Sequence, residues 1–135
     1  MSEDGTGNEY GCERCWPREA AAAWEAGKGF AKVAELVHES HYSVKILACP
    51  KCPQNFLSVF TEMVDWALGE DPMFWTVVPL DAVDVAALIG STGAPRKADL
   101  EAMAGDRRSL FRDFPKDASE PTVGWGVGLT IGPHD

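Results

Sequence analysis

Residues 49–54 read CPKCPQ and lie between two apolar stretches, YSVKILA at residues 42–48 and NFLSVFTEMVDW at residues 55–66. Large apolar side chains alternate with small or polar ones over residues 42–48, which predicts a strand, and the second stretch favours a strand that returns beside it. Residues 74–80, FWTVVPL, predict a third strand. The simplest arrangement is a small antiparallel three-stranded meander with the two cysteines at the turn of its first hairpin.

A second cysteine pair, CERC at residues 12–15, repeats the C-x-x-C spacing, and the chain has four cysteines in all. Each short turn brings two thiolates together and points backbone N–H groups at them, so two such turns can supply four sulfur ligands to one tetrahedral zinc ion. A closed site of four thiolates leaves zinc no open position for water or substrate, which predicts a structural ion and not a catalytic one. The predicted ligands of this single zinc are Cys12, Cys15, Cys49 and Cys52.

The segment Cys49-Pro50-Lys51-Cys52 resembles the C-P-x-C zinc knuckle of the zinc-ribbon and treble-clef group of four-cysteine zinc-binding domains. The resemblance implies a zinc-binding part over residues 11–80, with the knuckle at the tip of a hairpin. The chain departs from the group at Pro53, where such knuckles commonly have glycine. It also departs after the first pair, where a helix is expected in place of a ribbon hairpin.

Other chemistries of the cysteines stay open at this point. One C-x-x-C pair could exchange thiol and disulfide, because a helix start lowers the pKa of a cysteine. Cys12 and Cys15 precede a predicted helix, although no apolar strand precedes them. An iron–sulfur cluster and four inert thiols are further alternatives. His38 and His41 are spaced to share a metal, but their expected position at a helix end favours a capping or surface role.

The remaining segments are predicted to be helical, apart from the last one. Pro17, an alanine run and apolar residues at helical spacing predict an N-terminal helix that extends to about residue 37, with Gly27 and Gly29 able to split it. Asp81 is a predicted N-cap and Gly90 a predicted stop of a second helix.

A third helix is predicted over residues 96–114, and the Gly-rich stretch TVGWGVGLTIG at residues 122–132 predicts a C-terminal strand. The expected fold class is therefore α+β: a three-stranded meander with a zinc knuckle, one N-terminal helix, two later helices and a final strand. Residues 1–10 form an acidic tail, and residues 11–135 form a single zinc-stapled domain.

The net charge of −9 argues against nucleic acid as the main partner, because binding to phosphates depends on Lys and Arg. The N-terminus lacks an apolar signal sequence and no stretch is long enough to span a membrane, which predicts a cytoplasmic protein whose thiols stay reduced. Residues 52–95 contain no Lys, Arg or His. An acidic aromatic surface in this segment predicts a basic protein partner.

The expected function is therefore non-enzymatic protein–protein interaction, such as that of an immunity-type or antitoxin-type inhibitor of a basic enzyme. Two alternatives are an enzyme that uses an acidic cleft and a thiol–disulfide redox protein. The predicted partner-binding residues are Asp65, Trp66, Glu70, Asp71, Phe74 and Trp75.

Overall fold

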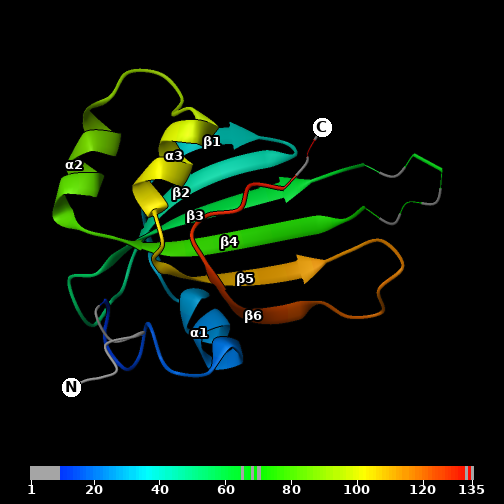
Figure 1. Ribbon diagram of the computed structural model, residues 1–135, viewed down its shortest axis with the longest axis horizontal. Coiled ribbons are helices and arrows are strands. Elements are labelled where there is room, and N and C mark those ends of the chain that lie inside the picture. The colour runs from blue at the N-terminus through cyan, green and yellow to red at the C-terminus, as the bar shows by residue number, and fades with distance from the viewer. Residues whose placement is uncertain (1–9, 65, 68, 70, 133, 135) are drawn as a thin grey trace.

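The computed structural model describes residues 10–64, 66, 67, 69, 71–132 and 134, so the predicted acidic tail lies outside the described residues except for Tyr10. The protein is built on one six-stranded antiparallel sheet in the order β1-β2-β3-β4-β5-β6 (Figure 1). The strands are β1 (Ala31–Glu39), β2 (Tyr42–Ala48), β3 (Asn55–Glu62), β4 (Met73–Leu80), β5 (Arg108–Phe114) and β6 (Thr122–Val127), and the helices are α1 (Ala20–Gly27), α2 (Ala82–Gly90) and α3 (Lys97–Ala104). Within the described part of the chain, no helix has the length and apolar character needed to cross a membrane.

The predicted three-stranded meander is wrong, because the sheet has six strands and most of the regular structure is β. Its three expected strands correspond to β2, β3 and β4, which pair in antiparallel order. The error lies in two segments predicted to be entirely helical, each of which contains a strand. These strands, β1 and β5, extend the meander on both sides.

Strand β1 has helical spacing of apolar residues because it is irregular. Its pairing with β2 shifts between Lys32 and Ala34 and again between Glu35 and Val37. Each shift adds a residue on the β1 side, so inward-facing positions recur every three residues instead of every two. Ala34 and Val37 therefore face the same core at a spacing that resembles a helix.

The predicted third helix ends early, at a glycine. Helix α3 ends at Ala104, and Gly105 follows with a φ of 55°, in the left-handed region where glycine is strongly favoured. The chain then enters β5, whose Leu110 is buried. Helix α2 matches its prediction, because the Asp81 side chain accepts a hydrogen bond from the Asp84 N–H and forms a capping box.

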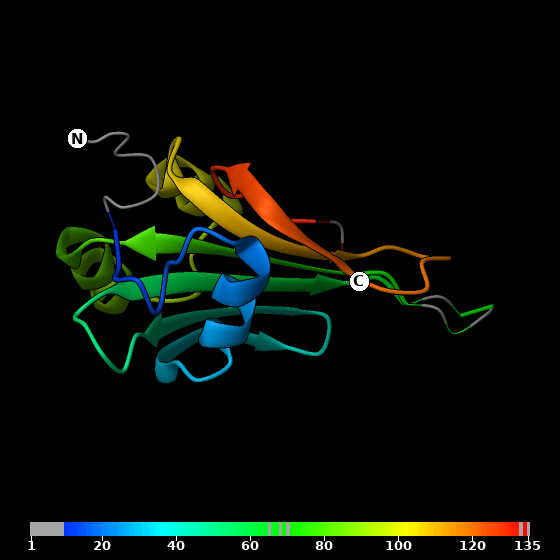
Figure 2. The same ribbon diagram turned by 90° about the horizontal axis from the view of Figure 1, so that it is seen from below.

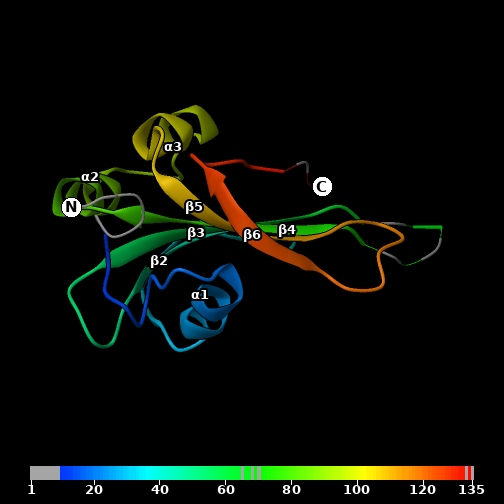
Figure 3. The same cartoon turned by 60° about the horizontal axis from the view of Figure 1, so that its bottom comes forward.

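Helices cover both faces of the sheet, α1 on one and α2 and α3 on the other (Figures 2 and 3). The face under α2 and α3 buries residues such as Ile46, Leu57 and Val78 together with Leu100 of α3. We refer to the opposite face as the α1 face. Its buried residues include the following: Cys15, Trp16, Ala23, Cys49, Phe56, Val77 and Leu110. Two of the four cysteines thus belong to the core of the α1 face.

Candidate metal centre

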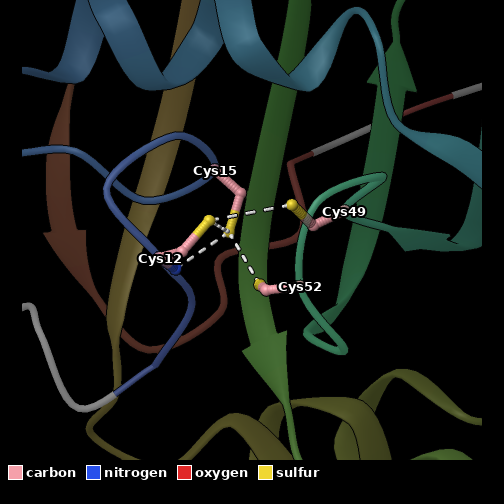
Figure 4. A group of neighbouring side chains, drawn as sticks. All are labelled: Cys12, Cys15, Cys49 and Cys52. Carbon is pink, nitrogen blue, oxygen red and sulfur yellow. Dashed lines mark hydrogen bonds between the residues drawn. The ribbon is translucent and has the colours of Figure 1, made fainter.

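The four cysteines come together at one end of the sheet, from two loops that are far apart in sequence (Figure 4). Cys12 and Cys15 lie in the loop that precedes α1, and Cys49 and Cys52 lie in the turn between β2 and β3. The β2–β3 pairing runs without irregularity to Ala48 and Asn55, so the hairpin holds its turn in a defined position. The predicted convergence of the two C-x-x-C pairs is confirmed.

The sulfur atoms are spaced as one ion requires. All four lie within 4.8 Å of one another. The Sγ atoms are 3.7 Å apart for Cys12 and Cys15, 3.9 Å for Cys12 and Cys49, and 3.7 Å for Cys15 and Cys52. Four sulfur atoms at about 2.3 Å from a tetrahedral zinc ion are about 3.8 Å apart. The cysteines are therefore positioned to bind one metal ion, in an arrangement compatible with a single structural zinc.

Backbone groups support the sulfur atoms of both turns. The Lys51 N–H donates to the Cys49 sulfur at 3.3 Å, and the Cys12 N–H donates to the Cys15 sulfur at 3.2 Å. The Cys49 N–H donates to the Gln54 carbonyl at 3.0 Å and closes the knuckle turn. Such donors orient metal ligands and offset part of the negative charge of the thiolates.

Gln54 joins the two cysteine loops, a role that sequence reasoning missed. Its side-chain oxygen accepts a hydrogen bond from the Gly11 N–H at 2.9 Å. Its amide nitrogen donates to the carbonyls of Asn55 at 2.6 Å and Leu80 at 2.7 Å. One side chain thus connects the loop before Cys12, the knuckle turn and the end of β4. The only sequence signal was its position directly after the knuckle.

Burial of the site favours a cation at its centre. Burial raises the pKa of the Cys15 and Cys52 thiols, whereas hydrogen bonding to the Cys15 backbone lowers the pKa of Cys12 to about 7. A buried thiolate without a counter-charge is costly, and four adjacent ones repel each other. A zinc ion removes this cost, because it deprotonates its thiol ligands and balances part of their charge.

Comparison with protein-family models, curated proteins and solved structures finds no match for this chain. The metal centre is therefore identified by its sulfur geometry, which is consistent with a zinc-binding domain, and no comparison assigns the chain to a specific group of such domains.

The predicted partner-binding residues differ in exposure where the structure describes them. Asp65 and Glu70 lie outside the described residues. Trp66 is 88% exposed, and Asp71 is half-buried. The two remaining aromatic residues, Phe74 and Trp75, are half-buried in β4, where they pack on Phe111 and on Trp24 and Phe60, respectively.

The histidines lie away from the cysteines. His38 lies in β1 and His41 lies in the turn between β1 and β2, and neither is at a helix end. Their Nδ1 atoms are 2.8 Å from a Glu35 oxygen and 3.2 Å from a Glu62 oxygen, respectively. The expected location was wrong, but each histidine has a carboxylate partner near the surface of the sheet.

Gly11 lies in the loop before α1 and packs closely on Cys15 and Trp16, and a substitution can test this packing. Its φ is +73°, and an added Cβ would lie 2.8 Å from the Trp16 Cβ and 2.9 Å from the Cys15 Sγ. We expect Gly11→Ala to weaken zinc binding by tenfold or more, roughly the effect of disturbing groups that orient metal ligands. Competition with a chromophoric zinc chelator measures the affinity.

Gly93→Ala is the matched control, because Gly93 has a φ of +76° and no atom within 4 Å of its added Cβ. It carries the same backbone strain without a collision at the metal centre. Equal zinc affinities for the two variants would contradict the close packing of Gly11 on Cys15 and Trp16.

Proposed function

We propose that this protein is a zinc-stapled interaction module that binds a basic protein partner through the tip of its β3–β4 hairpin. The observation that carries the proposal is the 88% exposure of Trp66 in this hairpin, which extends beyond the rest of the sheet (Figure 1). Tryptophan is a frequent interface hot spot, since burying its large ring contributes much of the binding energy. Trp75 already packs on Trp24 and Phe60, so its ring is not free to be buried by a partner as that of Trp66 is.

The zinc in this proposal stabilises the fold and does not touch the partner. The knuckle and the hairpin tip lie at opposite ends of β3, because the strand begins at Asn55 and ends at Glu62. Eight residues of strand separate the two ends by about 26 Å. A closed site of four thiolates also leaves the ion no position for substrate.

Charge favours a basic partner. The sequence from residue 52 to residue 95 contains acidic residues but no Lys, Arg or His, and the hairpin lies within it. Such a segment attracts a positively charged surface and accelerates association with it. An inhibitor of immunity or antitoxin type, which covers the basic surface of an enzyme, is the specific form of this proposal. A cytoplasmic location belongs to it as well, because reduced cysteines are available for zinc there.

Partner binding can be tested with Trp66→Ala and a matched control, Val127→Ala. Val127 is also a large exposed apolar residue, at 73%, but lies at the end of β6. A basic protein captured from the source cells is produced in pure form, and its affinity for each variant is measured by calorimetry. We expect Trp66→Ala to weaken binding about thirtyfold or more, as for an interface hot spot, and Val127→Ala to leave it unchanged. Equal affinity of Trp66→Ala and the wild-type protein would rule out the hairpin as the binding surface.

A further inference from the structure

A cavity of about 180 Å³ lies between α1 and the sheet. Aromatic and aliphatic side chains dominate its lining, among them Trp24 of α1, Leu47 of β2, Trp75 and Val77 of β4, and Leu110 of β5. An apolar cavity of about 150 Å³ is large enough to bind benzene. The space beneath α1 therefore matches a single aromatic ring with a small substituent.

Arg112 does not line this cavity but packs on two tryptophans that do. It follows Leu110 by two residues on β5, so both side chains lie on the same face of the sheet. Its guanidinium carbon is 4.8 Å from the centre of the Trp75 ring and 5.4 Å from that of Trp24, two rings that line the cavity. The cavity thus has a cation beside two of its aromatic walls.

The guanidinium of Arg112 has different contacts from those of two other arginines, Arg107 and Arg96. Arg107 pairs with Asp84 at 2.6 Å, and Arg96 pairs with Asp99 at 3.0 Å. Within the described part of the chain, the contacts of the Arg112 guanidinium are with aromatic rings and not with a carboxylate. A guanidinium stacked on rings keeps the N–H groups at its edge available, and these suit the two oxygen atoms of a carboxylate.

We propose that this cavity binds a small aromatic carboxylate, whose ring packs against Trp24 and Trp75 and whose carboxylate pairs with Arg112. A largely apolar pocket with a few polar groups is the usual form of a small-molecule site. Ser58 and Lys28 are the polar side chains of the lining, and the Lys28 ammonium is paired with Glu25 at 2.9 Å. The site is separate from the hairpin tip, so this proposal does not depend on the one for a protein partner.

The metal centre forms part of the cavity wall. Cys15 and Trp16 both line the cavity, and Trp16 is held next to the cysteines by the hydrogen bond from its N–H to the Cys12 carbonyl at 2.9 Å. Loss of the metal would free the loop that leads into α1 and would open the cavity. Ligand binding is therefore tested with the full-length zinc-loaded protein.

The test is a titration of the zinc-loaded protein with phenylacetate, followed by two-dimensional NMR of backbone and indole N–H groups. We expect saturable shifts at millimolar concentration for the indole groups of Trp24 and Trp75 and for the Gly27 N–H. Phenylacetamide has the same shape without the charge and should bind about tenfold more weakly, because it lacks the charge-assisted pair. Acetate, which has no ring, should cause no saturable shift of these groups.

Two variants separate the roles of charge and space. Arg112→Gln should remove the preference for phenylacetate over phenylacetamide. Gly27→Leu should block both ligands, because Gly27 lines the cavity and the nearest atom to its added Cβ is 3.9 Å away, which leaves room for the new side chain. Arg96→Gln, an exposed arginine on the α2 and α3 side of the sheet, is the matched control and should bind like the wild-type protein.

Four results would overturn the proposal. The first is the absence of saturable shifts with phenylacetate, and the second is a set of shifts confined to residues away from the cavity. The third is a preference for phenylacetate that persists in folded Arg112→Gln. Unchanged binding to folded Gly27→Leu would equally place the ligand elsewhere.

Discussion

Replacing Cys49 with serine is expected to release the zinc and to unfold or aggregate the protein. Cys49 is buried, and its sulfur lies 3.9 Å from that of Cys12, which belongs to the other cysteine loop. Serine is a poorer ligand than a soft thiolate, and the substitution leaves three thiolates around a weakly held ion, of which that of Cys15 is buried and those of Cys12 and Cys52 are partly buried. Structural zinc contributes on the order of 10 kcal/mol in small domains, which is comparable to a total stability of about 5–15 kcal/mol.

Circular dichroism and metal analysis of the purified variant measure this effect. The wild-type protein should carry about one zinc per chain and should lose its fold when a strong chelator is added. Lys51→Ala is the control, because Lys51 is exposed in the same turn and its backbone N–H to the Cys49 sulfur survives the substitution. A Cys49→Ser protein that keeps its strand signal and melts within a few degrees of the control would contradict a structural role for the metal.

The metal centre could be predicted because the spacing of two cysteines within one short turn is a local property of the sequence. A C-x-x-C turn places two sulfur atoms together whatever the rest of the chain does, and two such turns with no other cysteine suggest one shared ion. Gln54 could not be predicted in the same way. Its hydrogen bonds to Gly11 and Leu80 depend on three segments that meet only in the folded protein.

Four of the six strands, β2, β3, β4 and β6, were predicted from the sequence, and the two that were missed have a physical reason. Strands β2 to β4 pair in continuous register, and their short apolar runs, which in β2 have a period of two, are visible in the sequence. Strand β1 is an edge strand whose irregular pairing changes its period to three, and exposed charged residues such as Lys32 and Glu35 then give it the pattern of a surface helix. Pairing with β2 decides its structure, and pairing is not a local property.

Strand β5 shows a second limit, which concerns where one element ends. The apolar residues of 96–114 fit one long helix, but Gly105 stops α3 after eight residues. A glycine within a helical pattern can be either tolerated or a stop, and the choice depends on what the following residues pack against. Here Leu110 and Arg112 pack under α1 as part of the sheet, so the strand is favoured.

Deleting the residues after Pro121 is expected to lower the melting temperature strongly. The deletion removes β6, whose Trp125 meets Trp16 edge to face with ring centres 4.9 Å apart. The Trp125 ring also lies 3.7 Å from the Arg108 guanidinium carbon, and its indole N–H donates a hydrogen bond to the Arg18 carbonyl at 2.8 Å. It also removes Leu129, which is buried in the core under α2 and α3. Each large apolar side chain contributes about 1.5–3 kcal/mol when fully buried, and half-buried Trp125 contributes through its ring contacts as well.

A shorter deletion, after Gly128, separates the contribution of β6 with Trp125 from that of the segment with Leu129. It keeps β6 paired with β5 and removes the segment that carries Leu129 and the Thr130 carbonyl, which accepts a hydrogen bond from the Thr76 hydroxyl at 2.8 Å. We expect it to lower the melting temperature less than the longer deletion, because Trp16 stays covered and the loop that holds Cys12 and Cys15 keeps its packing. The longer deletion should in addition weaken zinc binding, since Trp16 adjoins Cys15 and would lose Trp125. Thermal denaturation of the two truncated proteins, with zinc affinity measured in parallel, tests both expectations. An unchanged melting temperature after the longer deletion would mean that β6 does not stabilise the core.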